Sequence, residues 1–335
     1  MRIYVSVPQG KIVDTTFFTQ AARSYLEQHF QVVYSPLDRH PTREELAQLA
    51  ADADVLMTGW GHPTVDAALL AGTNIRLLAH TGGSVADYAD PSLYEAGIRV
   101  ISGNELYAES VAEGVLAYML MALRRLPESA EEVRCGGWAL PFSTEGLLDQ
   151  TVGIIGMGAI SKKLIHLLQS FRVKLKLYSS HAIDAAYLQE NRAVQASLEE
   201  IFSTCKLVSL HSAQTEKTRG MIGKEHFDLL QDGSIFLNTA RGAIIREEEM
   251  IEALKEKRFR AVLDVYCQEP LAQENPLRSL PNVYPIPHKA GPTGDRRPLV
   301  VMALAEDILR FFRGEPLRYE ISSQQALRMT KERKP

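Results

Sequence analysis

The chain has 335 residues and a formal net charge of −4, and 45% of its residues are hydrophobic while 23% are charged. This length is too great for one ordinary hydrophobic core and predicts two domains, and the composition is typical of a globular protein rather than a fibrous or disordered one. The weak negative charge excludes a broad basic surface for nucleic acid.

The first hundred residues alternate between short β-rich runs and helical patterns. The β-rich runs read RIYVSVP, QVVYSP, DVLMTGW, IRLLAHTGG and IRVIS. Between them, Thr42-x-x-Glu45 is a capping box that predicts a helix start, because its hydroxyl and carboxylate each bind an amide of the first turn. Alternation of this kind predicts βαβ units and a parallel sheet.

A long helix is predicted next, over Leu106–Leu126, and it is apolar on most of its surface. The longest purely apolar stretch, Val115–Leu123, is too short to span a bilayer, and the first strand is not preceded by a charged and then apolar leader. We therefore expect a buried helix in a cytoplasmic protein that has no membrane partner.

After the polar connector RCGGWALPFSTEG the alternation restarts. The new runs read QTVGIIGMG, VKLKLYSS, LVSLHS, SIFLNTA, AVLDVYC and VYPIP, which predict a second doubly wound sheet. A final amphipathic helix is predicted over Leu299–Phe312, and its periodicity does not decide on which domain it packs. The basic tail RMTKERKP follows it. Three cysteines without a C-x-x-C spacing predict free thiols and no metal site.

The segment from Gly156 to Ser161 joins a predicted strand to a predicted helix and has the pattern of a dinucleotide-binding turn. Gly156 permits the tight turn, Gly158 lets the backbone approach a pyrophosphate, and amides at the helix start hold the anion. We expect contacts from Gly156, Met157, Gly158, Ala159 and Ile160. Ser161 replaces the usual third glycine, where a small residue suffices. The alternative is a tight turn that binds no ligand.

Ser179 stands where an acidic residue usually binds the ribose, about 20 residues further on. Without a carboxylate, the ribose hydroxyl loses its preferred acceptor and a 2′-phosphate is no longer repelled. No Arg or Lys follows closely, and His181 is a poor phosphate ligand at neutral pH. The sequence thus slightly favours NAD and leaves NADP open.

Three consecutive predicted strands end at polar residues, namely Arg241, Glu269 and His288. The carboxyl ends of parallel strands share one edge of a sheet, where ligands bind, so we expect these side chains to converge. Each residue alone is ordinary, since a loop Arg is usually solvated, a Glu before Pro is usually a turn residue and a lone His is usually structural.

The three residue types suit reduction of a 2-oxo acid. Arg241 can bind the substrate carboxylate and polarise the carbonyl with its planar guanidinium group. His288 can donate a proton to the carbonyl oxygen, because histidine changes protonation near neutral pH. Glu269 beside it would orient the imidazole and raise its pKa.

Five segments resemble the signature blocks of the D-2-hydroxyacid dehydrogenases, in that family's order and spacing: ESVAEGVLAYML, HSAQTEKTRGMI, FLNTARGAII, AVLDVYCQEPL and PIPHKAG. The resemblance covers about residues 50–315. It implies that Arg241, Glu269 and His288 are catalytic and that Asp264 contacts the nicotinamide. It also implies that the cofactor cleft includes Ser179, His211, Thr215, Thr239, Ala240 and Gly291.

The same resemblance implies how the chain is divided. Residues 1–103 form the first part of a substrate-binding domain, residues 104–292 form an inserted Rossmann domain, and residues 293–335 return to the substrate domain. The expected fold is therefore α/β with two doubly wound parallel-sheet domains of the Rossmann or flavodoxin-like type. The long helix near residue 115 is expected to join a homodimer interface of two nucleotide-binding domains.

Several residues depart from the family's pattern. The substrate loop carries Gly82, Gly83 and Ser84 instead of Gly-x-Gly, Tyr107 replaces a common Asn, and Ala213 replaces a frequent Pro. Lys289 after His288 is unusual, and its charge could lower the pKa of the histidine unless it points to solvent. Trp60 stands where phosphoglycerate-type members tend to carry Arg, which favours an apolar or aromatic substrate, although a core tryptophan is an equal alternative.

The first hypothesis is an NAD(P)-dependent dehydrogenase or reductase of a D-2-hydroxy acid and its 2-oxo partner, with substrate contacts from Trp60, Gly82, Gly83, Ser84, Tyr107 and Arg241. The alternative is an NAD-sensing interaction protein that resembles the C-terminal binding corepressors. A formate dehydrogenase is disfavoured, because those relatives usually have Gln at the position of Glu269. The sequence leaves open the substrate side chain and the physiological direction.

Overall fold

The computed structural model describes residues 1–138 and 144–331 and divides into two compact units. Unit 1 comprises Met1–Tyr107 and Pro292–Pro335, and unit 2 comprises Ala108–Gly291, so unit 2 is inserted into the chain of unit 1. The predicted α/β fold with two doubly wound parallel sheets is confirmed. Residues 139–143 of the predicted connector and residues 332–335 of the basic tail lie outside the described residues.

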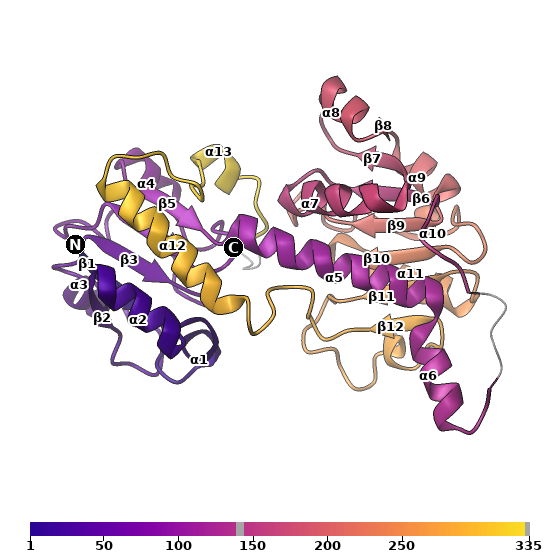
Figure 1. Cartoon of the computed structure of the whole chain (residues 1–335), viewed down its shortest axis with the longest axis horizontal. Coiled ribbons are helices and arrows are strands. Elements are labelled where there is room, and N and C mark those ends of the chain that lie inside the picture. Colours follow the sequence, from indigo (N-terminus) through magenta and orange to yellow (C-terminus); the bar gives the residue numbers. More distant parts are fainter. Residues whose placement is uncertain (139–143, 332–335) are drawn as a thin grey trace. The chain divides into compact units, whose positions relative to one another are not determined.

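Unit 1 is built on a five-stranded parallel sheet in the order β2-β1-β3-β4-β5, which is the flavodoxin-type order (Figure 1). Its strands are β1 (Arg2–Ser6), β2 (Gln31–Tyr34), β3 (Val55–Thr58), β4 (Leu77–His80) and β5 (Arg99–Ser102). Its helices are α1 (Ile12–Phe17), α2 (Gln20–His29), α3 (Arg43–Leu49), α4 (Pro91–Glu95), α12 (Arg297–Phe312) and α13 (Ser323–Ala326). The chain leaves unit 1 within α5 (Asn104–Arg124).

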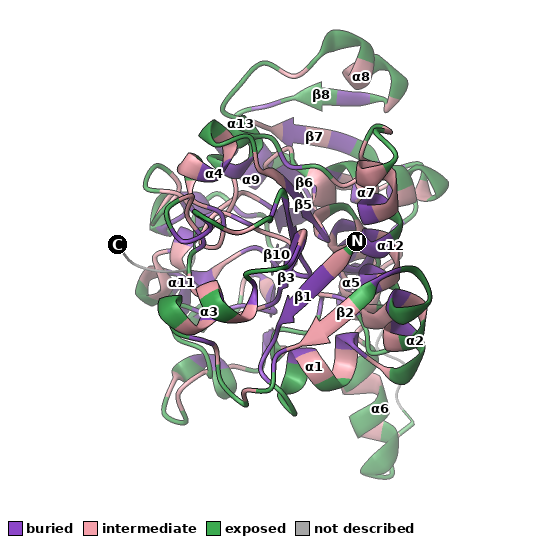
Figure 2. Ribbon diagram, turned by 90° about the vertical axis from the view of Figure 1, so that its left-hand side faces the viewer, coloured by how far each residue is buried: buried purple, intermediate pink, exposed green. Residues whose placement is uncertain are grey.

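The unit 1 sheet is covered on both faces, so its central strands are buried throughout (Figure 2). Ile3 and Val5 of β1 belong to a core cluster that also contains residues of α1, α2 and α12. Tyr4, between them, points to the other face and joins a cluster with residues of α3, α4 and α13. Alternate residues of one strand thus supply both cores, as a sheet with two covered faces requires.

Unit 2 contains a seven-stranded parallel sheet in the order β12-β11-β10-β9-β6-β7-β8. Numbered within the unit, six strands have the dinucleotide-binding order 3-2-1-4-5-6, and β12 extends it at one edge. The strands are β6 (Thr151–Ile155), β7 (Lys174–Tyr178), β8 (Ala193–Gln195), β9 (Leu207–Leu210), β10 (Ile235–Asn238), β11 (Arg260–Leu263) and β12 (Val283–Pro285). The α-helices are α6 (Leu126–Arg134), α7 (Ala159–Leu168), α8 (Ala185–Glu190), α9 (Leu198–Thr204), α10 (Lys224–Phe227) and α11 (Glu247–Lys255). Short 3-10 turns lie at Gln169–Phe171, Gly242–Ile244 and Pro276–Arg278.

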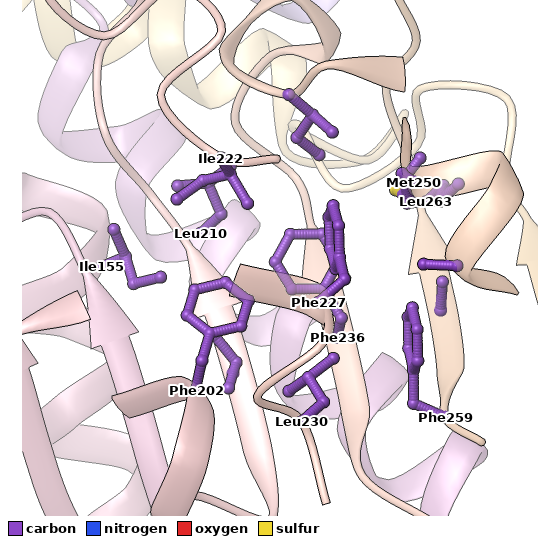
Figure 3. Packing of buried hydrophobic residues seen from close by; sticks show 14 of the residues in the cluster. Ile155, Phe202, Leu210, Ile222, Phe227, Leu230, Phe236, Met250, Phe259 and Leu263 are labelled. Carbon is purple, nitrogen blue, oxygen red and sulfur yellow. The ribbon is translucent and has the colours of Figure 1, made fainter. Parts of the chain in front are cut away.

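The two faces of the unit 2 sheet have separate hydrophobic clusters. One contains residues of α5 and α7, and the other contains residues of α9, α10 and α11. In the second cluster the rings of Phe202, Phe227 and Phe236 point toward one another (Figure 3). Phe227 and Phe236 meet edge to face with ring centroids 5.4 Å apart. Because Phe236 belongs to β10, this packing holds that strand and the loop at its carboxyl end.

The long helix predicted over Leu106–Leu126 is present as α5, and a separate helix that was not predicted, α6, follows it. α5 ends at Arg124, Arg125 has a left-handed backbone with φ of 50°, and α6 begins at Leu126. Pro127 is the cause, because its ring excludes the preceding turn of a continuous helix and suits the first turn of a new one. The last long helix likewise begins at Arg297, before the predicted Leu299, with a proline in its first turn.

α5 also has the length and the mean hydropathy, 1.3, of a membrane-crossing helix, although only 39% of that window is buried inside the structure. Its buried residues, which include Val115, Met119 and Leu123, pack in the core of unit 2. A core helix passes the same test of length and composition. The absence of a membrane partner therefore stays a prediction.

Candidate active site

Glu269 and His288 are in direct contact beyond the carboxyl ends of the neighbouring strands β11 and β12. Oε2 of Glu269 lies 2.7 Å from Nδ1 of His288. The other carboxylate oxygen, Oε1, accepts a 3.0 Å hydrogen bond from the amide of Tyr266. The carboxylate is thus fixed from both sides, and it fixes the orientation of the imidazole in turn.

This contact changes the protonation of both groups. The hydrogen bond that His288 donates to Glu269 is the largest cause that raises the pKa of His288, against burial and the charge of Arg241, which lower it. Burial is the largest single effect on the pKa of Glu269 and opposes its ionisation, but the hydrogen bonds from His288 and Tyr266 outweigh it and lower that pKa. The pair therefore favours an imidazolium beside a carboxylate. Lys289, whose charge could have lowered the pKa of His288, is exposed.

Arg241 follows β10, the strand beside β11, and its charge acts on both members of the pair. Buried Asn238 shapes its turn, since the side-chain oxygen accepts from the Ala240 amide at 3.0 Å and the side-chain nitrogen donates to the Arg241 carbonyl at 3.1 Å. The three residues predicted from strand ends therefore share one edge of the unit 2 sheet.

Asp264 has a position that the sequence did not reveal. Its buried carboxylate accepts hydrogen bonds from the amides of Lys289 at 2.6 Å and Ala290 at 3.0 Å, and from the Tyr118 hydroxyl at 3.3 Å. His288 itself has a left-handed backbone with φ of 51°, and its amide donates to the Asp264 carbonyl at 3.0 Å. Asp264 thus holds the strained turn that presents His288.

The turn after β6 fits a dinucleotide phosphate. Gly156 has φ of 101°, and a Cβ there would lie 2.7 Å from the amide nitrogen of Ser212, so only glycine suits this position. A Cβ on Gly158 would meet nothing within 4 Å, which leaves space for a ligand. Gly158 precedes α7, whose first amides have no partner within the helix and can bind an anion.

Ser161 adds a contact that a third glycine could not make. Its buried hydroxyl donates a 2.6 Å hydrogen bond to the carbonyl of Gly156, across the turn. The serine therefore stabilises the first glycine's unusual conformation while remaining small enough for close packing of α7 on the sheet.

The remaining predicted cofactor residues are distributed over the loops that follow β7, β9 and β10. His211, after β9, lies beside the glycine turn, since its amide donates to the Ile155 carbonyl at 2.7 Å. Burial lowers the pKa of His211 to about 4, so the ring is neutral at pH 7.

Ser179 follows β7 and accepts a 3.2 Å hydrogen bond from the His181 amide. Thr215 bonds within its own loop, to Thr218. Thr239 and Ala240 are buried beside Arg241, and Gly291 ends unit 2.

In unit 1 the substrate loop follows β4, and its amide groups are available. Those of Gly82, Gly83 and Ser84 donate to no residue in the described part of the chain. Its carbonyl groups are occupied instead, because the Gly103 amide donates to Gly82 at 3.0 Å and the Ser102 hydroxyl donates to Gly83 at 3.0 Å. Backbone amides without a protein partner can donate hydrogen bonds to a bound carboxylate.

Trp60 and Tyr107 lie together in unit 1. Their rings meet edge to face with centroids 6.2 Å apart, and Trp60 also meets Phe17 edge to face at 5.1 Å. The Arg297 guanidinium lies over the Trp60 ring, 5.5 Å from its centroid. Trp60 is only partly buried, so it packs against the core cluster and also reaches the surface. Nothing in the sequence pattern indicated this contact of Arg297, which is the first residue of α12.

Comparison with known proteins identifies the family of the chain. Residues 116–290 match the model of the D-isomer specific 2-hydroxyacid dehydrogenase family, NAD binding domain. The chain belongs to this family. The resemblance seen in the sequence blocks is thereby confirmed, and the matched segment contains the glycine turn together with Arg241, Glu269 and His288.

Two curated relatives of this family illustrate its range. A D-3-phosphoglycerate dehydrogenase from Methanocaldococcus jannaschii is 31% identical over 82% of this chain and 52% of its own length, so the chain spans about half of that relative. A human glyoxylate reductase/hydroxypyruvate reductase is 30% identical over 75% of this chain and 78% of its own length.

Solved structures agree on the fold. A phosphoglycerate oxidoreductase from Rhizobium etli has a TM-score of 0.80 at 22% identity and covers 96% of this chain and 98% of its own. The D-mandelate dehydrogenase of Rhodotorula graminis has a TM-score of 0.79 at 21% identity, covering 96% and 97%. At these identities the likeness establishes the architecture of this family member, not its substrate.

Proposed function

We propose that the protein is an NAD(P)-dependent dehydrogenase that transfers a hydride between the nicotinamide and C2 of a 2-oxo acid or D-2-hydroxy acid. The observation that carries the proposal is the 2.7 Å contact between Glu269 and His288, within a segment that matches the NAD binding domain of the family. A histidine with a raised pKa, oriented by a carboxylate, is suited to proton transfer at a carbonyl oxygen.

In this mechanism each residue has a separate role. His288, protonated in the direction of reduction, donates its proton to the carbonyl oxygen while Glu269 stabilises the imidazolium. Arg241 binds the substrate carboxylate and polarises the carbonyl. The bound nicotinamide supplies the hydride. After reduction His288 is neutral and regains a proton from solvent, which its partial exposure allows.

The two units have different roles in the proposal. Residues 104–292 bind the nucleotide, with the pyrophosphate at the amides of Gly158 and the first turn of α7. Residues 1–103 and 293–335 bind the substrate, and the unused amides of Gly82, Gly83 and Ser84 receive its carboxylate. Trp60 and Tyr107 contact the substrate side chain.

We propose NAD rather than NADP as the preferred cofactor. Ser179 offers a hydroxyl to the ribose, and its Oγ already accepts the His181 amide, so this turn keeps its conformation without a charge. A 2′-phosphate would need a cation at this turn, and His181 is the one basic side chain in the Ser179–His181 stretch.

A homodimer through the nucleotide-binding domain is also part of the proposal. α5 is strongly apolar, yet most of its hydrophobic window is not buried within one copy. Leu126 and Val133 of α6, which follows it, are each 54% exposed. A second copy would cover this surface, and light scattering behind size exclusion would report twice the monomer mass. A cytoplasmic location stays a prediction.

The activity is tested by initial rates with NADH and NADPH against glyoxylate, hydroxypyruvate, pyruvate, phenylpyruvate and 2-oxoisocaproate. We expect turnover of at least one acid, and His288→Ala should lower it by about two orders of magnitude or more without weakening NADH binding. NADH binding without turnover of any acid would support the alternative, a nucleotide-sensing interaction protein. Unchanged turnover in His288→Ala would remove that residue from the mechanism.

A further inference from the structure

The segment after α12 is attached to unit 1 along its length. Asp307, fully buried on α12, accepts the amides of Arg318 and Tyr319 with Oδ2 at 2.9 and 2.8 Å. Glu320 forms an isolated antiparallel bridge with Ile101 of β5, and its carboxylate pairs with Arg99. The chain is thus carried from α12 along the edge of the sheet to α13.

Beyond α13 the chain reaches the substrate loop. Ala326 is buried and Met329 packs against the core cluster that also contains Val85, the residue after the loop. The hydroxyl of Ser84 then donates a 2.7 Å hydrogen bond to the carbonyl of Thr330, which is 246 residues away in sequence. The same Ser84 oxygen accepts the amide of Ala86 at 3.3 Å.

This bond completes the attachment of the loop. Gly82 and Gly83 are anchored through their carbonyl groups to Gly103 and Ser102, both beside the start of α5. Ser84 is anchored through its side chain to Thr330. These bonds hold the loop through its carbonyl and side-chain groups, and the amides of its three residues stay available for an anion.

We propose that residues 327–330, here called the latch, position the Gly82–Ser84 loop for the substrate carboxylate. The inference rests on the proposed function, because it assigns Ser84 the task of orienting amides that bind a 2-oxo acid. The Ser84 hydroxyl acts as a positioning group, since it donates to the Thr330 carbonyl and accepts the Ala86 amide. Its effect is therefore on substrate binding, separate from the proton transfer at His288.

The latch is tested with Ser84→Ala, which removes the hydroxyl and adds no new group to the loop. Loss of one hydrogen bond that orients a binding loop should raise KM for the 2-oxo acid about two- to tenfold. The change in kcat should be smaller than the change in KM, and the Kd for NADH should not move. Met329→Ala, which loosens the latch without touching the loop, should raise KM in the same direction.

Thr42→Ala is the matched control, because it removes a hydroxyl hydrogen bond at the start of α3 in the same unit. It should lower Tm and leave KM unchanged. Hydrogen exchange of residues 81–86 is a second measurement, and it does not depend on turnover. Exchange should be faster in Ser84→Ala than in the wild type. The proposed role of the latch would be overturned if the wild-type protein reduces 2-oxo acids and Ser84→Ala changes neither KM nor hydrogen exchange. Absence of wild-type turnover would overturn the proposed function instead.

Discussion

The backbone amide of Lys289 donates a 2.6 Å hydrogen bond to Oδ1 of Asp264, so a carboxylate after β11 fixes the residue that follows His288. The second carboxylate oxygen accepts the amide of Ala290 at 3.0 Å. A left-handed residue such as His288 needs support from its surroundings, and these two bonds supply it. Asp264 therefore contributes to the site through the backbone.

We expect Asp264→Asn to lower both stability and turnover. The amide side chain keeps one acceptor but turns a donor toward a backbone N–H, which leaves a buried donor without a partner and costs about 1–3 kcal/mol. Urea unfolding measures the decrease in the free energy of unfolding. The kcat should also fall, because His288 loses its fixed position. Tyr118→Phe removes only the 3.3 Å bond and should change both quantities much less. Equal effects of the two variants would contradict this role.

The pH dependence should follow from the contact between Glu269 and His288. Reduction needs the protonated imidazole, so its rate is full below the pKa of His288 and is lost as the pH rises through that pKa. Glu269→Gln removes the charge that raises this pKa, while burial and Arg241 still lower it. The alkaline limb of kcat/KM should therefore move to lower pH. Glu247→Gln is the control, since Glu247 binds the Cys267 amide nearby. If the alkaline limb of kcat/KM lies at the same pH in Glu269→Gln as in the wild type, the pair has no part in proton transfer.

The two glycines of the phosphate turn should respond differently to alanine. Gly158→Ala adds a methyl group that meets no protein atom within 4 Å, so Tm should stay the same. A pyrophosphate would meet that methyl group, and the Kd for NADH, measured by fluorescence, should rise about tenfold or more. Gly156→Ala instead clashes with Ser212 at a φ of 101° and should cost about 2 kcal/mol or more of stability. Unchanged NADH affinity in Gly158→Ala would argue that the turn binds no nucleotide.

The grouping of Arg241, Glu269 and His288 was predictable, because it depends only on where each strand ends in the sequence. Arg241, Glu269 and His288 each follow a strand, and parallel strands place their carboxyl ends on one edge, so the sequence pattern was sufficient to group them. The two sheets followed in the same way from the alternation of strand and helix patterns. The capping box at Thr42 and Glu45 is likewise present as predicted, because it depends on four consecutive residues.

Contacts between distant segments were not predictable from one sequence. Nothing in the local pattern around Asp264 indicates that its carboxylate binds the amides after His288, and nothing around Ser84 indicates Thr330. The helix α6 was missed for another reason, since none of its residues is buried and its sequence, LPESAEEVR, is mostly polar. β8, of three residues, is too short to produce an alternating pattern.

Ser161 offers a test of how this chain replaces the usual third glycine. Ser161→Ala removes the 2.6 Å bond to the Gly156 carbonyl and should destabilise the protein by about 1 kcal/mol. Ser161→Gly restores the common pattern but also places a flexible residue in α7, which adds about 1 kcal/mol to the loss. Urea unfolding should rank the proteins as wild type, then Ala, then Gly. A more stable Gly variant would show that the hydroxyl has no stabilising role.

Trp60 has two possible roles, one in the core of unit 1 and one in contact with the substrate, and substitution distinguishes them. It packs against Phe17 and Tyr107, so a purely structural role predicts that Trp60→Leu lowers stability and affects all substrates equally. A substrate-contacting role predicts a change in specificity. Burying an apolar side chain is worth about 1.5–3 kcal/mol, so kcat/KM for phenylpyruvate should fall roughly 10- to 100-fold relative to glyoxylate, which has no side chain. Trp60→Phe keeps an aromatic ring and should preserve most of the ratio. A constant ratio across the three proteins would assign Trp60 to the core alone.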